Sequence, residues 1–108
     1  MFSEIYCVIT GRVQRVGFRA FVESVARERE VVGWVHNRED GTVHVLMQGL
    51  PDVLKECTED LQTGSVLSRV DSVAVDWRTP GEQFNEFKIL SGYGGVYVAS
   101  LRWVYYGR

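Results

Sequence analysis

The segment of residues 9–19, with the sequence ITGRVQRVGFR, constrains the fold of this chain more than any other part of it. It joins an alternating pattern over residues 4–10, typical of a β-strand, to a pattern with helical spacing. The apolar positions of the helical pattern are Phe18, Phe21, Val22, Val25 and Ala26. The chain therefore has to turn sharply from a strand into a helix within a few residues.

A sharp turn between a strand and a helix can form a site for an anion. It directs several backbone N–H groups toward one point, and the helix N-terminus adds the positive end of its dipole. Gly11 and Gly17 supply conformational freedom for the turn, and Arg19 adds a planar guanidinium that suits phosphate. The alternative is a tight turn with a surface arginine. The segment lacks the Gly-Lys-Ser/Thr ending of a Walker A loop and the glycine spacing of a dinucleotide-binding fingerprint.

The composition indicates one globular domain. The chain has 108 residues, of which 24% are charged and 45% hydrophobic, and these values are typical of soluble proteins. Its net charge of −2 argues against nucleic acid or an anionic membrane as the main partner. No segment has the pattern of a membrane span or a signal peptide, so we expect a cytoplasmic protein. Cys7 and Cys57 lack metal-ligand spacing, and we expect buried free thiols and no metal site.

Local signals predict the remaining elements. The first helix should end near Glu30, and residues 31–35 follow as an extended run. The pair Asp40-Gly41 predicts a hairpin, after which Val43, Val45 and Met47 share one face of a strand.

A second helix should begin at Pro51 and end near Gly64, with its apolar stripe at Val53, Leu54, Cys57 and Leu61. Val73, Val75 and Trp77 then share one face of a fourth strand, and Phe87 and Ile89 should face inward from a short fifth strand.

The element order predicts an α+β protein. Because each helix has a single apolar stripe, both helices should cover one face of an antiparallel sheet. This is a ferredoxin-like α/β sandwich of order βαββαβ, with a short fifth strand and an extra C-terminal strand. We divide the chain into a domain over residues 1–90 and a C-terminal extension over residues 91–108.

Topology brings Asn37 toward the turn at residues 11–19. In a right-handed strand–helix–strand unit the first two strands are parallel, with room for the third between them, so their carboxyl ends lie at one end of the sheet. Asn37 stands where the second strand ends. Its amide could accept a hydrogen bond from water and donate one to an anion. The alternative is an ordinary residue that opens a turn.

At this point the chain resembles the acylphosphatase family. Residues 11–19 are similar to the family's phosphate loop, and residues 33–43, followed by Gly49, are similar to its second motif at matching spacing. The pattern of Phe84, Phe87 and Ile89 also suits the family's ending. The resemblance covers about residues 4–90. It implies a ferredoxin-like sandwich that hydrolyses carboxyl–phosphate mixed anhydrides without a metal or organic cofactor.

The resemblance also assigns roles to residues. Arg19 matches the family's phosphate-binding catalytic arginine, and Asn37 its water-orienting asparagine. The phosphoryl oxygens would accept hydrogen bonds from the backbone N–H groups of Gln14, Arg15, Val16, Gly17 and Phe18. The substrate would be a small acyl phosphate, and inorganic phosphate would be both the product and a competitive inhibitor. Such a reaction requires mainly positioning and charge stabilisation, and the sequence indicates no enzyme base.

Two positions depart from the family's pattern. The family usually has Gly where this chain has Arg15, so a positive φ at Arg15 would reduce stability, whereas a negative φ would leave its side chain in solvent. His36 stands where Lys or another polar residue is more usual, and we expect it to be an exposed strand residue. We also expect His44 on the solvent face, since no metal-ligand partner has a useful spacing.

Two other functions stay open. The same fold could serve as a non-catalytic phosphate- or ligand-binding module, including a degenerate domain that binds phosphate without turnover. An RNA-binding sheet would need stacking aromatic residues in its central strands, where the sequence offers only Tyr6. An assay with a chromogenic acyl phosphate distinguishes these functions from hydrolysis.

The extension over residues 91–108 has its own strand pattern. Apolar and aromatic residues alternate over residues 96–106 after a glycine-rich joint. Such a strand should pair with a sheet edge. Our hypothesis is that it adds to the sheet of another subunit and builds a homo-oligomer; the alternative is pairing within its own chain.

Overall fold

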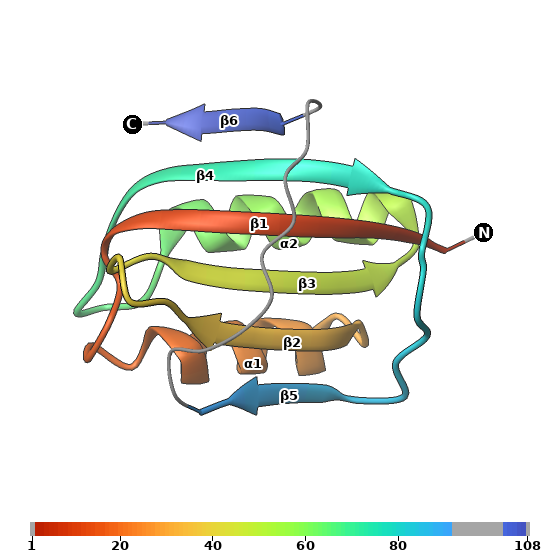
Figure 1. Cartoon of the computed structure of the whole chain (residues 1–108), viewed down its shortest axis with the longest axis horizontal. Coiled ribbons are helices and arrows are strands. Elements are labelled where there is room, and N and C mark those ends of the chain that lie inside the picture. Colours follow the sequence, from red (N-terminus) through yellow and green to blue (C-terminus); the bar gives the residue numbers. More distant parts are fainter. Residues whose placement is uncertain (1, 92–102, 108) are drawn as a thin grey trace.

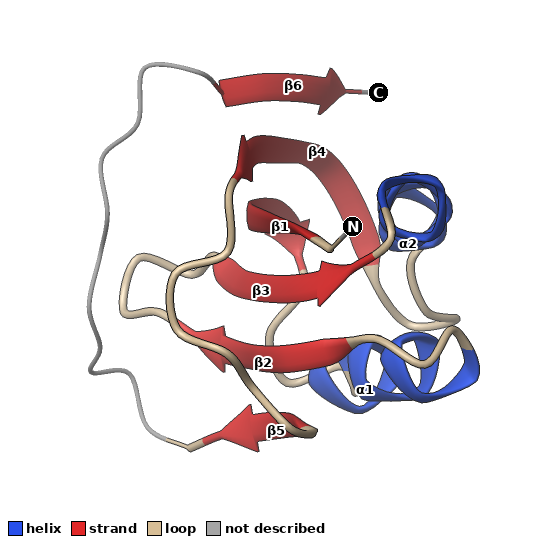
Figure 2. Ribbon diagram, turned by 90° about the vertical axis from the view of Figure 1, so that its right-hand side faces the viewer, coloured by secondary structure: helices blue, strands red, loops and turns tan. Residues whose placement is uncertain are grey.

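The computed structural model describes residues 2–91 and 103–107, and its strands form one sheet (Figure 1). Along the chain the elements are β1 (Ser3–Arg12), α1 (Phe18–Glu28), β2 (Val32–Asn37), β3 (Val43–Gly49), α2 (Pro51–Thr63), β4 (Arg69–Arg78), β5 (Phe87–Leu90) and β6 (Trp103–Gly107). The strand order across the sheet is β5-β2-β3-β1-β4-β6. Both helices cover the same face of this sheet (Figure 2). The predicted ferredoxin-like sandwich of order βαββαβ is confirmed.

Strand β3 lies between β1 and β2 and is antiparallel to both. Strands β1 and β2 are therefore parallel to each other, as predicted, and their carboxyl ends lie at the same end of the sheet. The turn between β1 and α1 and the turn after β2 consequently start side by side (Figure 1).

The sheet is mixed, so the prediction of an antiparallel sheet is wrong for its fifth strand. Strand β5 pairs with β2 in parallel. Strand β4 ends where β2 begins, and the chain crosses along that end of the sheet to the opposite edge, so β5 runs in the direction of β2 (Figure 1). The buried side chain of Gln48 fixes the crossing, since its Nε2 donates to the Glu82 carbonyl and its Oε1 accepts from Phe84 N at 3.2 Å.

Strand β1 changes its pairing register with β4 between Thr10 and Gly11, just before the chain turns into α1. The two backbones approach so closely that a Cβ on Gly11 would clash with the Arg69 carbonyl oxygen, and Gly11 has a φ of +124°. Only glycine fits this bulge, which bends the end of β1 toward the following loop.

The helices end as the sequence predicts. Helix α1 closes with backbone hydrogen bonds from Glu30 N to Arg27 O and from Val31 N to Ala26 O, a Schellman motif in which Glu30 has a φ of 57°. Pro51 stands in the first turn of α2, and Gly64 caps its C-terminus.

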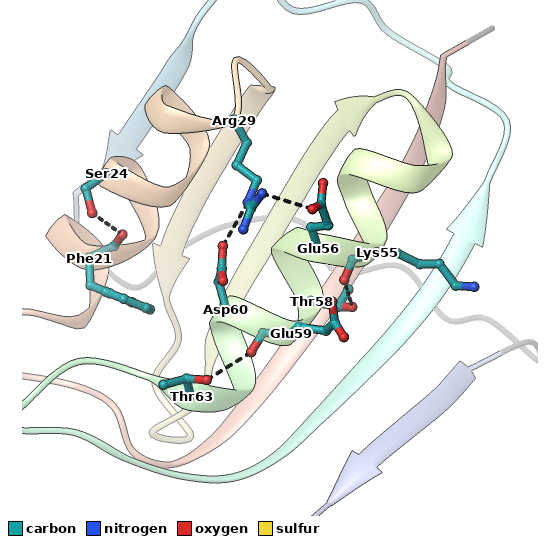
Figure 3. A network of polar contacts seen from close by, with 9 residues as sticks. All are labelled: Phe21, Ser24, Arg29, Lys55, Glu56, Thr58, Glu59, Asp60 and Thr63. Carbon is teal, nitrogen blue, oxygen red and sulfur yellow. Dashed lines mark hydrogen bonds and ion pairs between the residues drawn. The ribbon is translucent and has the colours of Figure 1, made fainter.

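A side-chain contact joins the two helices on their outer surface. Arg29 Nε lies 2.9 Å from an Asp60 carboxylate oxygen, and Arg29 Nη1 lies 3.3 Å from Glu56 (Figure 3). All three side chains are partly exposed, so we expect this network to add little stability beyond that of the apolar layer beneath it.

The core lies between the helices and the sheet. Its fully buried strand residues include Ile5, Cys7, Ile9, Val35, Val43, Val45, Met47, Val73 and Val75. From the helices, Phe18, Val22, Val25, Ala26, Leu54, Cys57 and Leu61 complete it, while Phe21, Val53 and Trp77 are partly buried against it. Cys7 and Cys57 are buried and free, as predicted, and burial raises the pKa of the Cys57 thiol to about 12.

The sheet face without helices carries an aromatic cluster of Tyr6, Trp34, His36 and His44. The rings of Tyr6 and Trp34 meet edge to face at 5.7 Å, and the Tyr6 hydroxyl lies 2.8 Å from His44 Nδ1. The predictions that His36 and His44 are exposed are wrong, because these cross-strand neighbours pack in this cluster and are only 7% and 8% exposed. Burial, followed by the charge of Arg38, lowers the pKa of His44 to about 4.

Strand β6 pairs antiparallel with β4 of the same chain, so the C-terminal strand is present over Trp103–Gly107. This pairing within the chain corresponds to the alternative given above, and not to the hypothesis that the strand pairs with another subunit. Residues 96–102 of that hypothesis lie outside the described residues, and the homo-oligomer stays a prediction.

Candidate active site

A pocket of about 210 Å³ opens where β1, β2 and β5 end. It is lined by Val13, Arg15, Gly17, Phe18, Arg19, Ala20, Asn37 and Ile89. The prediction that the loop after β1 and Asn37 lie together is therefore confirmed. Gln14 and Val16 belong to the same loop but do not line the pocket. Ile89, expected to face inward, is 38% exposed, because it lies at this opening at the end of an edge strand.

The N-terminus of α1 forms one wall of the pocket. Gly17 caps the helix with a φ of 75°, and no side chain accepts a hydrogen bond from the first turn. That turn contains no acidic residue, and the first helical backbone bond runs from Phe21 N to Gly17 O at 3.1 Å. The positive end of the helix dipole thus has no carboxylate of its own helix beside it.

Arg19 projects from the first turn of α1 and is held by β5. Its Nη1 donates a hydrogen bond of 3.0 Å to the carbonyl oxygen of Leu90, at the end of β5. This bond uses one of the five N–H donors of the guanidinium, and within the described residues the others have no hydrogen-bond partner. Among the described residues that line the pocket, the charged ones are Arg15 and Arg19, so the pocket favours an anion.

Asn37 reaches the pocket from the end of β2. The residue is only 7% exposed, and its buried Oδ1 has no hydrogen-bond partner in the part of the chain described. A buried acceptor without a partner is unfavourable by about 1–3 kcal/mol, so such groups usually bind water or a ligand. Asn37 is also one of the residues that line the pocket, so its amide group lies beside the arginines of the lining.

The side chain of Gln14 ties the loop to the turn between β2 and β3. Its Nε2 donates to the Arg38 carbonyl at 2.7 Å and to the Thr42 carbonyl at 2.9 Å. These carbonyls lie at the base of the turn that starts immediately after Asn37. The turn itself is fixed by Asp40, whose carboxylate accepts hydrogen bonds from the hydroxyl and the N–H of Thr42, and these bonds lower the pKa of Asp40.

Arg15 adopts the positive φ that should reduce stability. Its φ is 61°, in the left-handed region, and its side chain is exposed at the pocket. A glycine would adopt this conformation without strain.

The contacts of Leu90 and of the Gln14 side chain were not predicted. Leu90 lies 71 positions from Arg19, and the partners of Gln14 lie 24 and 28 positions away. No local sequence pattern predicts these contacts. A glutamine within a short loop does indicate that its side-chain amide has a carbonyl partner nearby.

Two features are absent from the described residues, a cluster of metal-ligating side chains and a helix that could span a membrane. These residues include no group of three or more His, Cys, Asp and Glu side chains placed to hold a metal ion. Within the same part of the chain, neither helix has the length and hydrophobicity of a membrane span.

A pocket with two arginines at a helix N-terminus, on a ferredoxin-like sandwich, defines a small α+β protein with a site suited to an anion. The family model of acylphosphatase matches residues 5–89. The acylphosphatase of Bacillus licheniformis is 42% identical over 82 residues, which cover 76% of this chain and 91% of that protein. The chain therefore belongs to the acylphosphatase family, as the resemblance implied.

Solved structures agree with this assignment. The crystal structure of acylphosphatase from Bacillus subtilis matches with a TM-score of 0.80 and 36% identity, covering 82% of this chain and 99% of that one. The acylphosphatase from Coxiella burnetii matches with a TM-score of 0.75 and 30% identity, covering 82% and 93%. The predicted enzyme class, a hydrolase acting on acid anhydrides, is the class of this family.

Proposed function

We propose that this protein hydrolyses small acyl phosphates to a carboxylate and inorganic phosphate. The observation that carries the proposal is the buried, unpartnered Oδ1 of Asn37, which lines the same pocket as Arg19 and the N-terminus of α1. The pocket thereby offers an acceptor for a water molecule next to donors for a phosphoryl group.

In this proposal the phosphoryl group binds at the start of α1. The guanidinium of Arg19 and the backbone N–H groups of residues 14–18 donate hydrogen bonds to its oxygens. The bond from Arg19 to Leu90 restricts the guanidinium before the substrate arrives, so less freedom is lost on binding. Phosphoryl transfer through a loose transition state requires mainly this kind of positioning and charge stabilisation.

Asn37 orients the attacking water. Its Oδ1 accepts a hydrogen bond from the water, whose oxygen attacks phosphorus in line with the bond to the acyl oxygen. As the new P–O bond forms, the bond to the acyl oxygen breaks, and the water transfers a proton to a phosphoryl oxygen. The leaving carboxylate needs no strong acid, and the described lining residues include no His, Cys, Asp or Glu.

The experiment is a hydrolysis assay with benzoyl phosphate, with inorganic phosphate as a competitive inhibitor. Arg19→Ala should lower kcat/KM by about 10²–10³-fold, the usual loss for one preorganised donor, and should weaken inhibition by phosphate. Arg19→Lys should recover little, since an ammonium lacks the planar fork. Arg27→Ala, at an exposed arginine of the same helix, is the matched control and should leave both quantities unchanged.

Asn37→Ala distinguishes the orientation of water from the binding of phosphate. It should lower kcat strongly while the inhibition constant of phosphate stays within about twofold, because the lost contact is with the water. Wild-type protein that binds phosphate but hydrolyses no acyl phosphate would contradict the proposal and favour the non-catalytic binding module.

We also infer that residues 1–90 form the hydrolytic domain, that residues 91–108 are an extension of it, and that the protein is cytoplasmic.

A further inference from the structure

We infer that Arg15 selects acyl phosphates whose acyl group carries a negative charge of its own, such as the monophosphate anhydrides of dicarboxylic acids. This inference rests on the proposed function of the pocket and concerns the half of the substrate that leaves. Three features of Arg15 carry it: its place at the pocket, its lack of a polar partner among the described residues, and its backbone conformation.

Arg15 and Arg19 occupy different depths of the same pocket. Arg19 is partly buried and is held at 3.0 Å by the carbonyl of Leu90, whereas Arg15 is exposed. The pocket has about 210 Å³, below the range of roughly 300–1,000 Å³ typical of sites that enclose drug-sized ligands. It therefore holds the phosphoryl group and a few atoms more, and the distal end of a longer acyl group extends to the rim, where Arg15 lies.

The guanidinium of Arg15 has no polar partner within the described part of the chain. Arg29 and Arg78 both form ion pairs with carboxylates, but Arg15 forms no ion pair or hydrogen bond with the residues that the structure describes. No carboxylate is present among the described residues of the pocket lining. A carboxylate at the distal end of an acyl group would be the counterion that this site lacks.

The backbone conformation of Arg15 is the third feature that indicates a function for its side chain. The left-handed conformation at a φ of 61° is unfavourable for arginine and favourable for glycine. Strain of this kind persists most often where the side chain contributes to a site. Here the side chain brings a second positive charge to an anion pocket.

The test compares two substrates of equal acyl length, monosuccinyl phosphate and butyryl phosphate, by the ratio of their kcat/KM values. Wild-type protein should favour the succinyl compound, and Arg15→Gly should lower the ratio by about two- to fivefold, the range expected for a solvent-exposed ion pair. Arg15→Lys should retain most of the preference, and added salt should reduce it in the wild type. Arg12→Gln, which removes an equal charge from a residue outside the pocket lining, is the matched control and should leave the ratio unchanged.

The other outcomes are distinct. An unchanged ratio in Arg15→Gly would overturn the inference and leave the proposed function intact. An equal loss for both substrates, together with weaker inhibition by phosphate, would place Arg15 on the phosphoryl group and would also overturn it. Wild-type protein that hydrolyses neither compound would refute the proposed function, and the inference with it.

Discussion

Arg15→Gly should stabilise the fold although it removes a long side chain. The left-handed conformation of Arg15 is unfavourable by about 1–2 kcal/mol for a residue with a Cβ. Glycine relieves this strain but loses about 0.5–1 kcal/mol through its greater freedom in the unfolded chain. The net gain is about 0.5–1 kcal/mol, because the exposed Arg15 side chain has no hydrogen bond or ion pair with the described residues to lose. In a domain of this size we expect Tm to rise by about 2–8 °C.

Thermal unfolding followed by circular dichroism measures this effect. Two controls isolate the backbone: Arg15→Ala keeps the Cβ and should not raise Tm, whereas Glu30→Gly removes the strain at the other described non-glycine residue with a positive φ, at 57°. A rise in Glu30→Gly without one in Arg15→Gly would refute the reasoning for the loop. Equal rises in Arg15→Gly and Arg15→Ala would assign the gain to the lost charge.

Three further predictions concern the contacts around the pocket, the opposite sheet face and the C-terminal strand. Gln14→Glu places a carboxylate against the two carbonyls at the base of the turn after Asn37, so the urea midpoint of unfolding and kcat should both fall, and Gln14→Met should lower them less. An unchanged kcat in both variants would show that this contact does not position Asn37. Burial lowers the pKa of His44 to about 4, whereas histidine in the unfolded chain has a pKa near 6.5, so the free energy of unfolding should fall by at most about 3 kcal/mol as the pH drops from 6.5 to 4. His44→Asn should reduce that fall in urea titrations, and an identical fall in the variant would contradict the assignment. Deleting residues 92–108 should yield a smaller, still active species by light scattering if the extension joins subunits, and a full-length protein that is already monomeric would rule out the homo-oligomer.

The sequence located those elements that single residues determine. Asp40-Gly41 marks the turn between β2 and β3, Pro51 begins α2, and Gly64 ends it, because each residue restricts its own backbone or its immediate neighbours. The direction of β5 was not predictable in this way. It depends on a crossing that Gln48 fixes from a distant strand, and no local pattern records which sheet edge the chain reaches.

For the candidate site, strand order was sufficient to bring Arg19 and Asn37 to one pocket. The exposure of His36 and His44 could not be predicted, because a strand pattern indicates which residues share a face and not what packs beside them. The roles of the pocket residues stay predictions until the variants are assayed.

The hydrogen bond between Arg19 and Leu90 spans 71 positions and has a consequence for biogenesis. A chain emerging from the ribosome contains the loop after β1 early, but the carbonyl that accepts a hydrogen bond from Arg19 arrives only when β5 has been made and docked. A contact between residues so far apart in the sequence costs more conformational entropy to form than a local contact does. The pocket should therefore mature in the final step of folding, and enzymatic activity should appear later during refolding than the far-ultraviolet signal of the helices.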